Sequence, residues 1–185
     1  MEITRQSTLV EVCFTVCTAL QHTEAIAVLT GGSAAVYYAP ERYQSADADF
    51  IVTWNQNPRA AASALRELGF IEKAGLYHHP ETPFVLEFPP GPLSIGETIV
   101  RTYETIRRGD SVLHVLSRTD SVCDRLAAFY HWGDRSSLRT ALDVAQGGEI
   151  DLKSVATWSE REGASEKFAE FVRRYHEERH ERRQG

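Results

Sequence analysis

The sequence predicts an α/β fold in which a mixed β-sheet is flanked by helices and followed by a C-terminal helical region. Two observations support this class. Strand-like apolar runs and helix-like periodic runs are interspersed up to residue 118, with glycine and proline turns between them. From residue 119 onward the pattern is helical throughout. We therefore expect an α/β core over residues 1–118 and a helical region over residues 119–185 that packs on this core.

The first elements follow from apolar periodicity and turn residues. Helical periodicity predicts a leading helix over 7–21, and the apolar run 25–30, stopped by two glycines, predicts a buried strand. Ser33 stands at the N-cap position of a short helix over 34–38. Pro40 cannot continue that helix, so a loop must follow it.

The middle of the chain alternates between strands and one further helix. An apolar strand-like run follows two aspartates, which predicts a strand over 47–53. An early proline, an alanine-rich run and a glycine stop predict a helix over 58–68. Two short strands, 70–73 and 75–78, surround a turn, and the run 84–88 predicts a strand that a Pro-Pro-Gly-Pro segment closes.

The remaining elements are a hairpin and helices. A Gly-Asp turn joins two strand-like runs, 103–108 and 112–117, in the predicted hairpin. Four amphipathic segments then predict helices, which begin near 121, at 134 or 136, at 151 and at 165.

Composition excludes several classes of protein. The 185 residues are 42% hydrophobic and 25% charged, as in an ordinary soluble globular protein. No apolar run approaches the roughly 20 residues that span a bilayer, and the N-terminus lacks the plan of a signal peptide. We therefore expect a cytoplasmic protein without a membrane partner. Three cysteines, Cys13, Cys17 and Cys123, form no disulfide framework, and we interpret them as small apolar core residues.

The glycine turn after the first predicted strand is a candidate phosphate site. Because a strand here runs into a helix N-terminus, backbone N–H groups and the helix dipole of Gly31, Gly32 and Ser33 would face a bound anion. Taken alone, however, a Gly-Gly-Ser segment is more often only a turn.

Two carboxylates mark the next predicted strand. Asp47 and Asp49 are two residues apart, so in a strand they share one face. Carboxylates on one face repel each other unless a cation lies between them, and Mg²⁺ or Mn²⁺ is the expected occupant. An Asp-x-Asp pair can also lie on a solvated strand edge without any function.

Two charged residues elsewhere have two interpretations each. Glu87 lies within an apolar strand, where a carboxylate is costly to bury unless it is paired or bound to a metal; alternatively it lies on an edge strand and faces solvent. Arg42, in the predicted loop, either contacts a triphosphate or pairs with a surface carboxylate.

Order and spacing give these residues a family resemblance. Gly32-Ser33, thirteen further residues and then Asp47-x-Asp49 resemble the signature of the nucleotidyltransferase superfamily. The finer pattern, Gly31 to Ala34 and then Arg42 to Phe50, resembles the AbiEii-type abortive-infection toxins. The resemblance implies a nucleotidyltransferase-type sheet and a Mg²⁺-dependent transfer of a nucleoside monophosphate from a nucleoside triphosphate. It also implies a toxin–antitoxin or phage-defence setting with an operon-encoded partner protein.

The resemblance also implies roles for single residues. The catalytic and metal-binding set would be Asp47, Asp49 and Glu87, the last as a third carboxylate on a neighbouring strand. The nucleotide-binding set would be Gly31, Gly32, Ser33, Arg42, Ser45 and Arg125, where Arg125 stands for a lysine of the family's following helix. Asp134-Arg135 reverses the Arg-Asp order that the family has after this helix.

The function stays open in two respects. The acceptor would be an RNA end, such as that of tRNA, or a protein hydroxyl. The alternatives to transfer are a catalytically inactive binding or regulatory partner with the same fold, and a metal-dependent phosphohydrolase.

Overall fold

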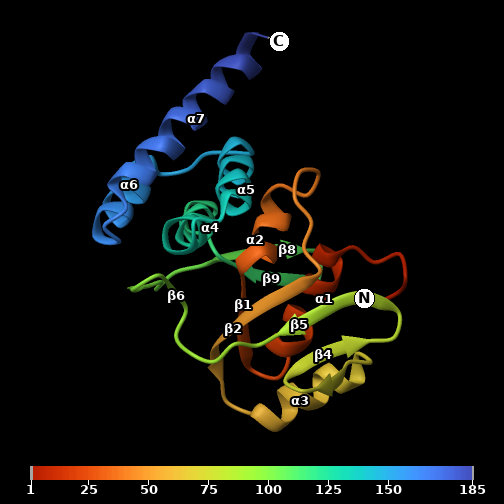
Figure 1. The fold of residues 1–185 in the computed structure, drawn as a ribbon. Coiled ribbons are helices and arrows are strands. Elements are labelled where there is room, and N and C mark those ends of the chain that lie inside the picture. The colour runs from red at the N-terminus through yellow and green to blue at the C-terminus, as the bar shows by residue number, and fades with distance from the viewer. Residues whose placement is uncertain (1, 185) are drawn as a thin grey trace.

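The fold class is confirmed by a computed structural model that describes residues 2–184, in which helices flank a mixed β-sheet (Figure 1). The helices are α1 (Leu9–Gln21), α2 (Gly31–Tyr38), α3 (Pro58–Glu67), α4 (Arg118–Trp132), α5 (Arg135–Gln146), α6 (Leu152–Arg161) and α7 (Ser165–Gln184). The strands are β1 (Ala25–Thr30), β2 (Asp47–Asn55), β3 (Ile71–Lys73), β4 (Leu76–His79), β5 (Thr82–Glu87), β6 (Ser94–Ile95), β7 (Thr98–Ile99), β8 (Glu104–Arg108) and β9 (Ser111–Val115). Within the described residues, no helix combines the length and the apolarity needed to cross a bilayer.

Strand β1 is an interior strand of a seven-stranded sheet with the order β3-β4-β5-β2-β1-β9-β8. It pairs antiparallel with β2 and parallel with β9, and β2 pairs parallel with β5. The chain returns from β2 to β5 through α3 and the β3–β4 hairpin, which is the long connection that parallel pairing requires. As a result, the end of β1, the start of β2 and the end of β5 lie side by side.

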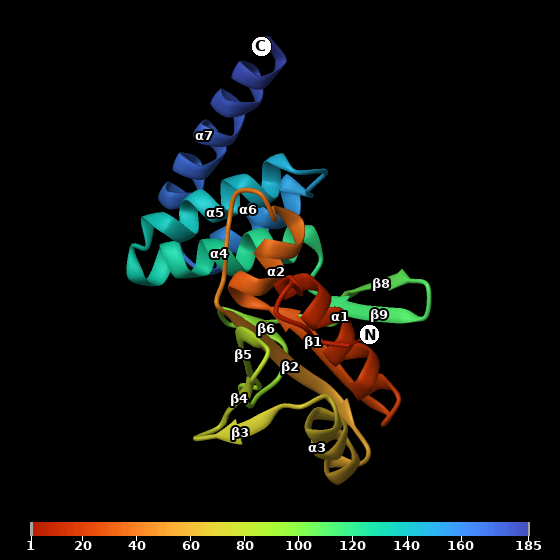
Figure 2. The same ribbon diagram turned by 90° about the vertical axis from the view of Figure 1, so that its right-hand side faces the viewer.

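Two hydrophobic cores cover the two faces of the sheet. Helices α1 and α3 cover one face, where Phe14, Phe50 and Leu86 are fully buried. The other face contributes Val28 to a second core, which is completed by α4 to α7 and includes Leu126. Figure 2 shows α4 to α7 gathered near α2, whereas α3 lies at the opposite end of the molecule. The predicted helical region therefore does pack on the α/β core.

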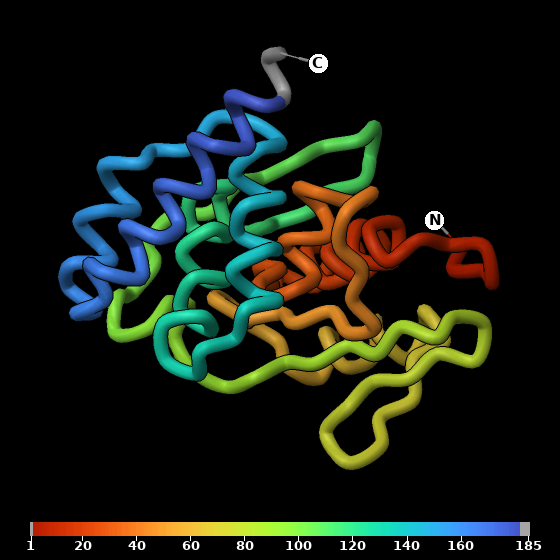
Figure 3. The backbone as a smooth tube through the Cα atoms, turned by 45° about the horizontal axis from the view of Figure 1, so that its top comes forward, coloured from red at the N-terminus to blue at the C-terminus, as the bar shows by residue number. Residues whose placement is uncertain are grey.

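The C-terminal helices form a layer of their own. Figure 3 shows α7 running alongside α5. Stacked rings of Phe171 and Tyr175, with centroids 6.0 Å apart, place the apolar side of α7 within the second core. The side-chain amide of Gln146 donates a hydrogen bond of 2.9 Å to the Tyr175 carbonyl oxygen, which fixes the end of α5 against α7.

Most predicted elements are confirmed, with three differences. Helix α2 begins at Gly31 with Thr30 at its N-cap, so the prediction of Ser33 as N-cap is wrong. Helix α4 begins at Arg118 rather than near residue 121, because the Ser117 hydroxyl accepts the Asp120 N–H at 3.0 Å and caps the helix there. The short β6–β7 hairpin was not predicted.

The three cysteines are buried and free, as the sequence predicts. Cys13 and Cys17 lie in α1 within the first core, and Cys123 lies in α4 within the second. Burial raises the pKa of Cys17 to about 12, so this thiol stays protonated and packs as a small apolar group.

Candidate functional site

The strand register brings the three predicted carboxylates together. In the parallel pairing of β2 with β5, Asp49 stands opposite Glu87, and Asp47 stands opposite Val85. Because residues two apart in a strand share a face, Asp47, Asp49 and Glu87 project from the same face of the sheet. Ala48, between the aspartates, is fully buried on the other face.

The surroundings of Glu87 decide between its two interpretations. Strand β5 lies between β4 and β2, so the interpretation as an edge-strand residue is wrong. Glu87 is half-buried and its neighbour across the strand pair is another carboxylate, Asp49. Glu87 therefore belongs with the two aspartates. We call Asp47, Asp49 and Glu87 the acidic cluster.

The glycine turn lies directly against this acidic cluster. Gly31 has a φ of +63°, in the left-handed region that favours glycine. A Cβ atom at Gly31 would lie 2.4 Å from Oδ2 of Asp49, a distance that no side chain could tolerate without displacing the carboxylate. Glycine is thus required here for two reasons, its backbone conformation and the close approach of the Asp49 carboxylate.

Ser33 joins the turn to the aspartate strand. Its hydroxyl donates a hydrogen bond of 2.8 Å to the Thr30 carbonyl oxygen and accepts the Asp49 N–H at 3.2 Å. The side chain is buried, with 1% of its surface exposed. Ser33 therefore links the end of β1 to the start of β2 through hydrogen bonds of its buried side chain.

The loop after α2 covers the second glycine of the turn. A Cβ atom at Gly32 would lie 2.9 Å from the Tyr43 hydroxyl and 3.2 Å from the Ser45 hydroxyl. Ser45, predicted from the family pattern, is thus close to the glycine turn. Tyr43 was not singled out in the sequence, because an aromatic residue in a loop carries no spacing signal of its own.

Burial and charge repulsion together perturb the pKa of Asp49. Burial, followed by the negative charges of Glu87 and Asp47, raises the pKa of Asp49 to about 6, and the positive charge of Arg125 opposes this rise. The three carboxylates therefore interact electrostatically, and the ionised form of Asp49 is disfavoured. A cation between them would relieve this cost.

Arg125 of α4 faces the acidic cluster from the helical side. Its Nε and Nη2 atoms donate hydrogen bonds of 2.9 and 2.6 Å to one carboxylate oxygen of Asp124. Burial lowers the pKa of Arg125, but Asp124, Tyr43 and Asp49 raise it, and the net pKa is above its ordinary value. Arg125 and Asp49 are therefore close enough for their charges to interact. Asp124 was missed, because only the packing of α4 over the sheet gives this residue its position.

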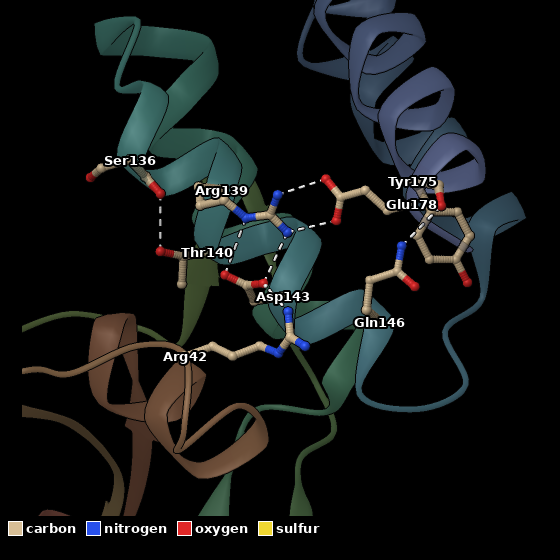
Figure 4. Close-up of polar contacts among 8 residues, drawn as sticks. All are labelled: Arg42, Ser136, Arg139, Thr140, Asp143, Gln146, Tyr175 and Glu178. Atoms are coloured by element: carbon tan, nitrogen blue, oxygen red, sulfur yellow. Dashed lines mark hydrogen bonds and ion pairs between the residues drawn. The ribbon is translucent and has the colours of Figure 1, made fainter. Parts of the chain in front are cut away.

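Arg42 takes the pairing role rather than a position at the acidic cluster. Its Nη1 atom lies 3.4 Å from Oδ1 of Asp143 on α5 (Figure 4). The carboxylate side chain of Asp143 is only 8% exposed, so the partner of Arg42 is buried and does not lie on the surface as expected. Contact of Arg42 with a nucleotide stays a prediction.

The acidic cluster has the donor chemistry of a site for a hard divalent cation. Carboxylate oxygens are the ligands that Mg²⁺ prefers, and Asp47, Asp49 and Glu87 offer them from one face. In the part of the chain that the structure describes, no three His, Cys, Asp or Glu side chains form a ready-made metal-binding group. A shared ion would therefore require these carboxylates to turn toward a common point.

The chain matches no protein-family model, and a search of curated proteins gives no significant match.

Proposed function

We propose that this protein is a Mg²⁺-dependent nucleotidyltransferase that transfers a nucleoside monophosphate from a nucleoside triphosphate to an acceptor hydroxyl. The observation that carries the proposal is the junction of the acidic cluster with the glycine turn. Asp49 stands opposite Glu87 in the sheet, and its carboxylate lies against Gly31. A phosphate on the turn would thus be adjacent to the carboxylates that bind its metal ion.

Different parts of the site would bind the phosphates and the metal ion. Backbone N–H groups of the turn would bind phosphate oxygens at the start of α2, where the helix dipole favours negative charge. Arg125 carries a positive charge near Asp49 and would contribute to phosphate binding. When bound by Asp47, Asp49 and Glu87, Mg²⁺ supplies charge neutralisation.

The reaction needs no covalent intermediate. The acceptor hydroxyl would attack the α-phosphate in line, the bond to the bridging oxygen of the β-phosphate would break, and pyrophosphate would leave. A carboxylate of the acidic cluster would accept the hydroxyl proton. An RNA end and a protein hydroxyl both provide the required acceptor.

Label transfer tests the proposal directly. The full-length protein is incubated with Mg²⁺, each of four α-phosphate-labelled nucleoside triphosphates, and either total tRNA or a cell lysate. We expect label in RNA or in a protein band, and no label with Asp47→Ala/Asp49→Ala. The matched control, Asp110→Ala/Glu149→Ala, removes two exposed carboxylates outside the site and should transfer normally.

Other results would point to the alternatives. Triphosphate binding without transfer in either acceptor mixture would contradict the proposal in favour of a binding or regulatory protein. Release of free phosphate or nucleotide without a labelled acceptor would instead indicate a phosphohydrolase.

The metal requirement has an independent readout. At a Mg²⁺ concentration ten times its dissociation constant, binding to the native state should add about 1.4 kcal/mol to the free energy of unfolding. For a chain of this length, such a gain raises the melting temperature by roughly 3 to 6 °C. Asp49→Asn should lose most of this rise, and an equal rise in the variant would contradict metal binding at the acidic cluster.

A further inference from the structure

A cavity lies on the helical side of the molecule, and the acidic cluster does not line it. It has a volume of about 520 Å³ and is enclosed by the β6–β7 hairpin, the start of α4 and the exposed side of α6. None of its lining residues belongs to the acidic cluster or the glycine turn. A volume of this order is typical of small-molecule sites, which range from roughly 300 to 1,000 Å³.

The floor of this cavity is apolar and well fixed. Ile95, Cys123 and Trp158 line it and are almost fully buried. The indole Nε1–H of Trp158 donates a hydrogen bond of 3.3 Å to the Ile95 carbonyl oxygen. The ring of Tyr130 stacks on that of Trp158 with centroids 5.5 Å apart. A ligand would therefore meet a pre-formed aromatic surface.

The rim carries two cations without direct partners. Lys153, Thr157 and Arg161 line the cavity at intervals of four residues along α6, so they form one stripe. Among the residues whose side chains the structure describes, neither the Lys153 ammonium nor the Arg161 guanidinium makes a hydrogen bond or an ion pair. The two residues are separated by about 12 Å along the helix axis.

The acidic groups of the lining are engaged within the protein. Asp151 caps α6: its carboxylate accepts the N–H groups of Lys153 and Ser154, each at 3.0 Å, and the Ser154 hydroxyl at 2.7 Å. Asp120 accepts the Ser117 hydroxyl at 2.6 Å. These carboxylates accept hydrogen bonds within the protein, whereas the two cations keep their donors for a ligand. Lys153 and Asp151 also attract each other without forming an ion pair.

We infer that this cavity binds a small organic anion, with its charged group on the rim stripe of α6 that carries Lys153 and Arg161 and its apolar body against Trp158. The inference goes beyond the proposed transfer reaction and does not depend on it. It rests on the volume of the cavity, its aromatic floor and the two rim cations whose donors are not used in hydrogen bonds or ion pairs.

The anionic aromatic dye 8-anilinonaphthalene-1-sulfonate is a suitable first probe, because it combines a sulfonate with an apolar body. We expect its fluorescence to rise when it binds the full-length protein. Lys153→Ala/Arg161→Ala should weaken its affinity about tenfold, since charge-assisted contacts are lost while the floor is kept. The control Arg59→Ala/Lys73→Ala removes an exposed arginine and an exposed lysine elsewhere and should bind as the unmodified protein does.

Nuclear magnetic resonance locates the probe independently of affinity. With ¹⁵N-labelled protein, the dye should shift the indole resonance of Trp158 and leave those of the exposed Trp54 and Trp132 unchanged. The inference would be overturned by an absence of dye binding, by equal affinity in both double variants, or by shifts confined to Trp54 or Trp132. Transfer activity is not measured, so failure here would leave the proposed function untouched.

Discussion

Two clusters of charged side chains in this protein differ in the signs of their charges. The acidic cluster of Asp47, Asp49 and Glu87 joins groups of one sign on one face of the sheet, where the pKa of Asp49 is raised. On the helical side, charges alternate in sign. Arg139 of α5 donates to Asp143 at 2.9 and 3.2 Å, and to Glu178 of α7 at 2.6 and 2.7 Å (Figure 4).

The difference separates a candidate binding function from a structural one. In the alternating cluster every charge offsets its neighbour, so the contacts hold α5, α7 and the Arg42 loop together. In the acidic cluster each negative charge raises the free-energy cost of ionising the neighbouring carboxylates. Such an arrangement is typical of sites where a bound ligand offsets this cost. Substitutions in the two clusters should therefore have opposite effects on stability.

The largest effect is expected from Asp143→Ala in the alternating cluster. It leaves Arg139 and Arg42 without their shared partner in a partly buried position, which should lower the free energy of unfolding by about 2 to 4 kcal/mol. Urea denaturation measures this loss. Arg42→Ala is the control and should cost less than about 1 kcal/mol, because its side chain is 52% exposed. Equal losses in both variants would mean that the cluster does not act as a unit.

Gly31→Ala should have the next largest effect, by a steric route at the acidic cluster. A left-handed backbone and the contact with Asp49 should together cost about 2 kcal/mol in the free energy of unfolding. In an Asp49→Ala background, the carboxylate contact is absent, so the cost should fall to about 1 kcal/mol. A double-mutant cycle by denaturation measures the difference. An unchanged cost in that background would contradict the close approach.

Asp49→Asn should stabilise the protein, in contrast to Asp143→Ala. The folded-state pKa of Asp49 is about 6, above the ordinary value of 3.8, so the aspartate lowers stability as the pH rises between these values. The asparagine variant should therefore be more stable above pH 6, by about 1 to 2 kcal/mol after allowing for solvent exposure. The gain should vanish as the pH falls toward about 4.

Denaturation of both proteins at several pH values, without divalent cations, measures this gain. Asp110→Asn, in the exposed turn between β8 and β9, is the matched control and should show no such gain. A stability loss in Asp49→Asn at neutral pH would mean that the Asp49 carboxylate is already compensated by Arg125.

Local patterns predicted much of the fold. The apolar run of β1 and the glycines after it predicted a buried strand and the start of a helix, because these signals lie within a few residues of each other. The same locality explains why Asp47 and Asp49 were found as a pair. The two-residue strands β6 and β7 were missed because so short a run has no periodicity.

Long-range contacts could not be predicted in the same way. The position of Glu87 opposite Asp49 depends on how β5 returns to β2, and only the resemblance to a known family suggested it. The N-cap position of Ser33 was misplaced because its hydroxyl bonds to Asp49, sixteen residues later, as well as within the turn. The partner of Arg42 lies 101 residues away on α5, beyond the reach of any local pattern.

The place of β1 in the sheet has a consequence during synthesis. Its neighbour β2 follows soon after α2, but its other neighbour, β9, begins at Ser111, some eighty residues after β1 ends at Thr30. Until β9 is available, one edge of β1 lacks its native partner, and unpaired strand edges promote self-association. A nascent or truncated chain that ends before Ser111 should therefore be prone to aggregation, and a chaperone that shields this edge would aid its folding.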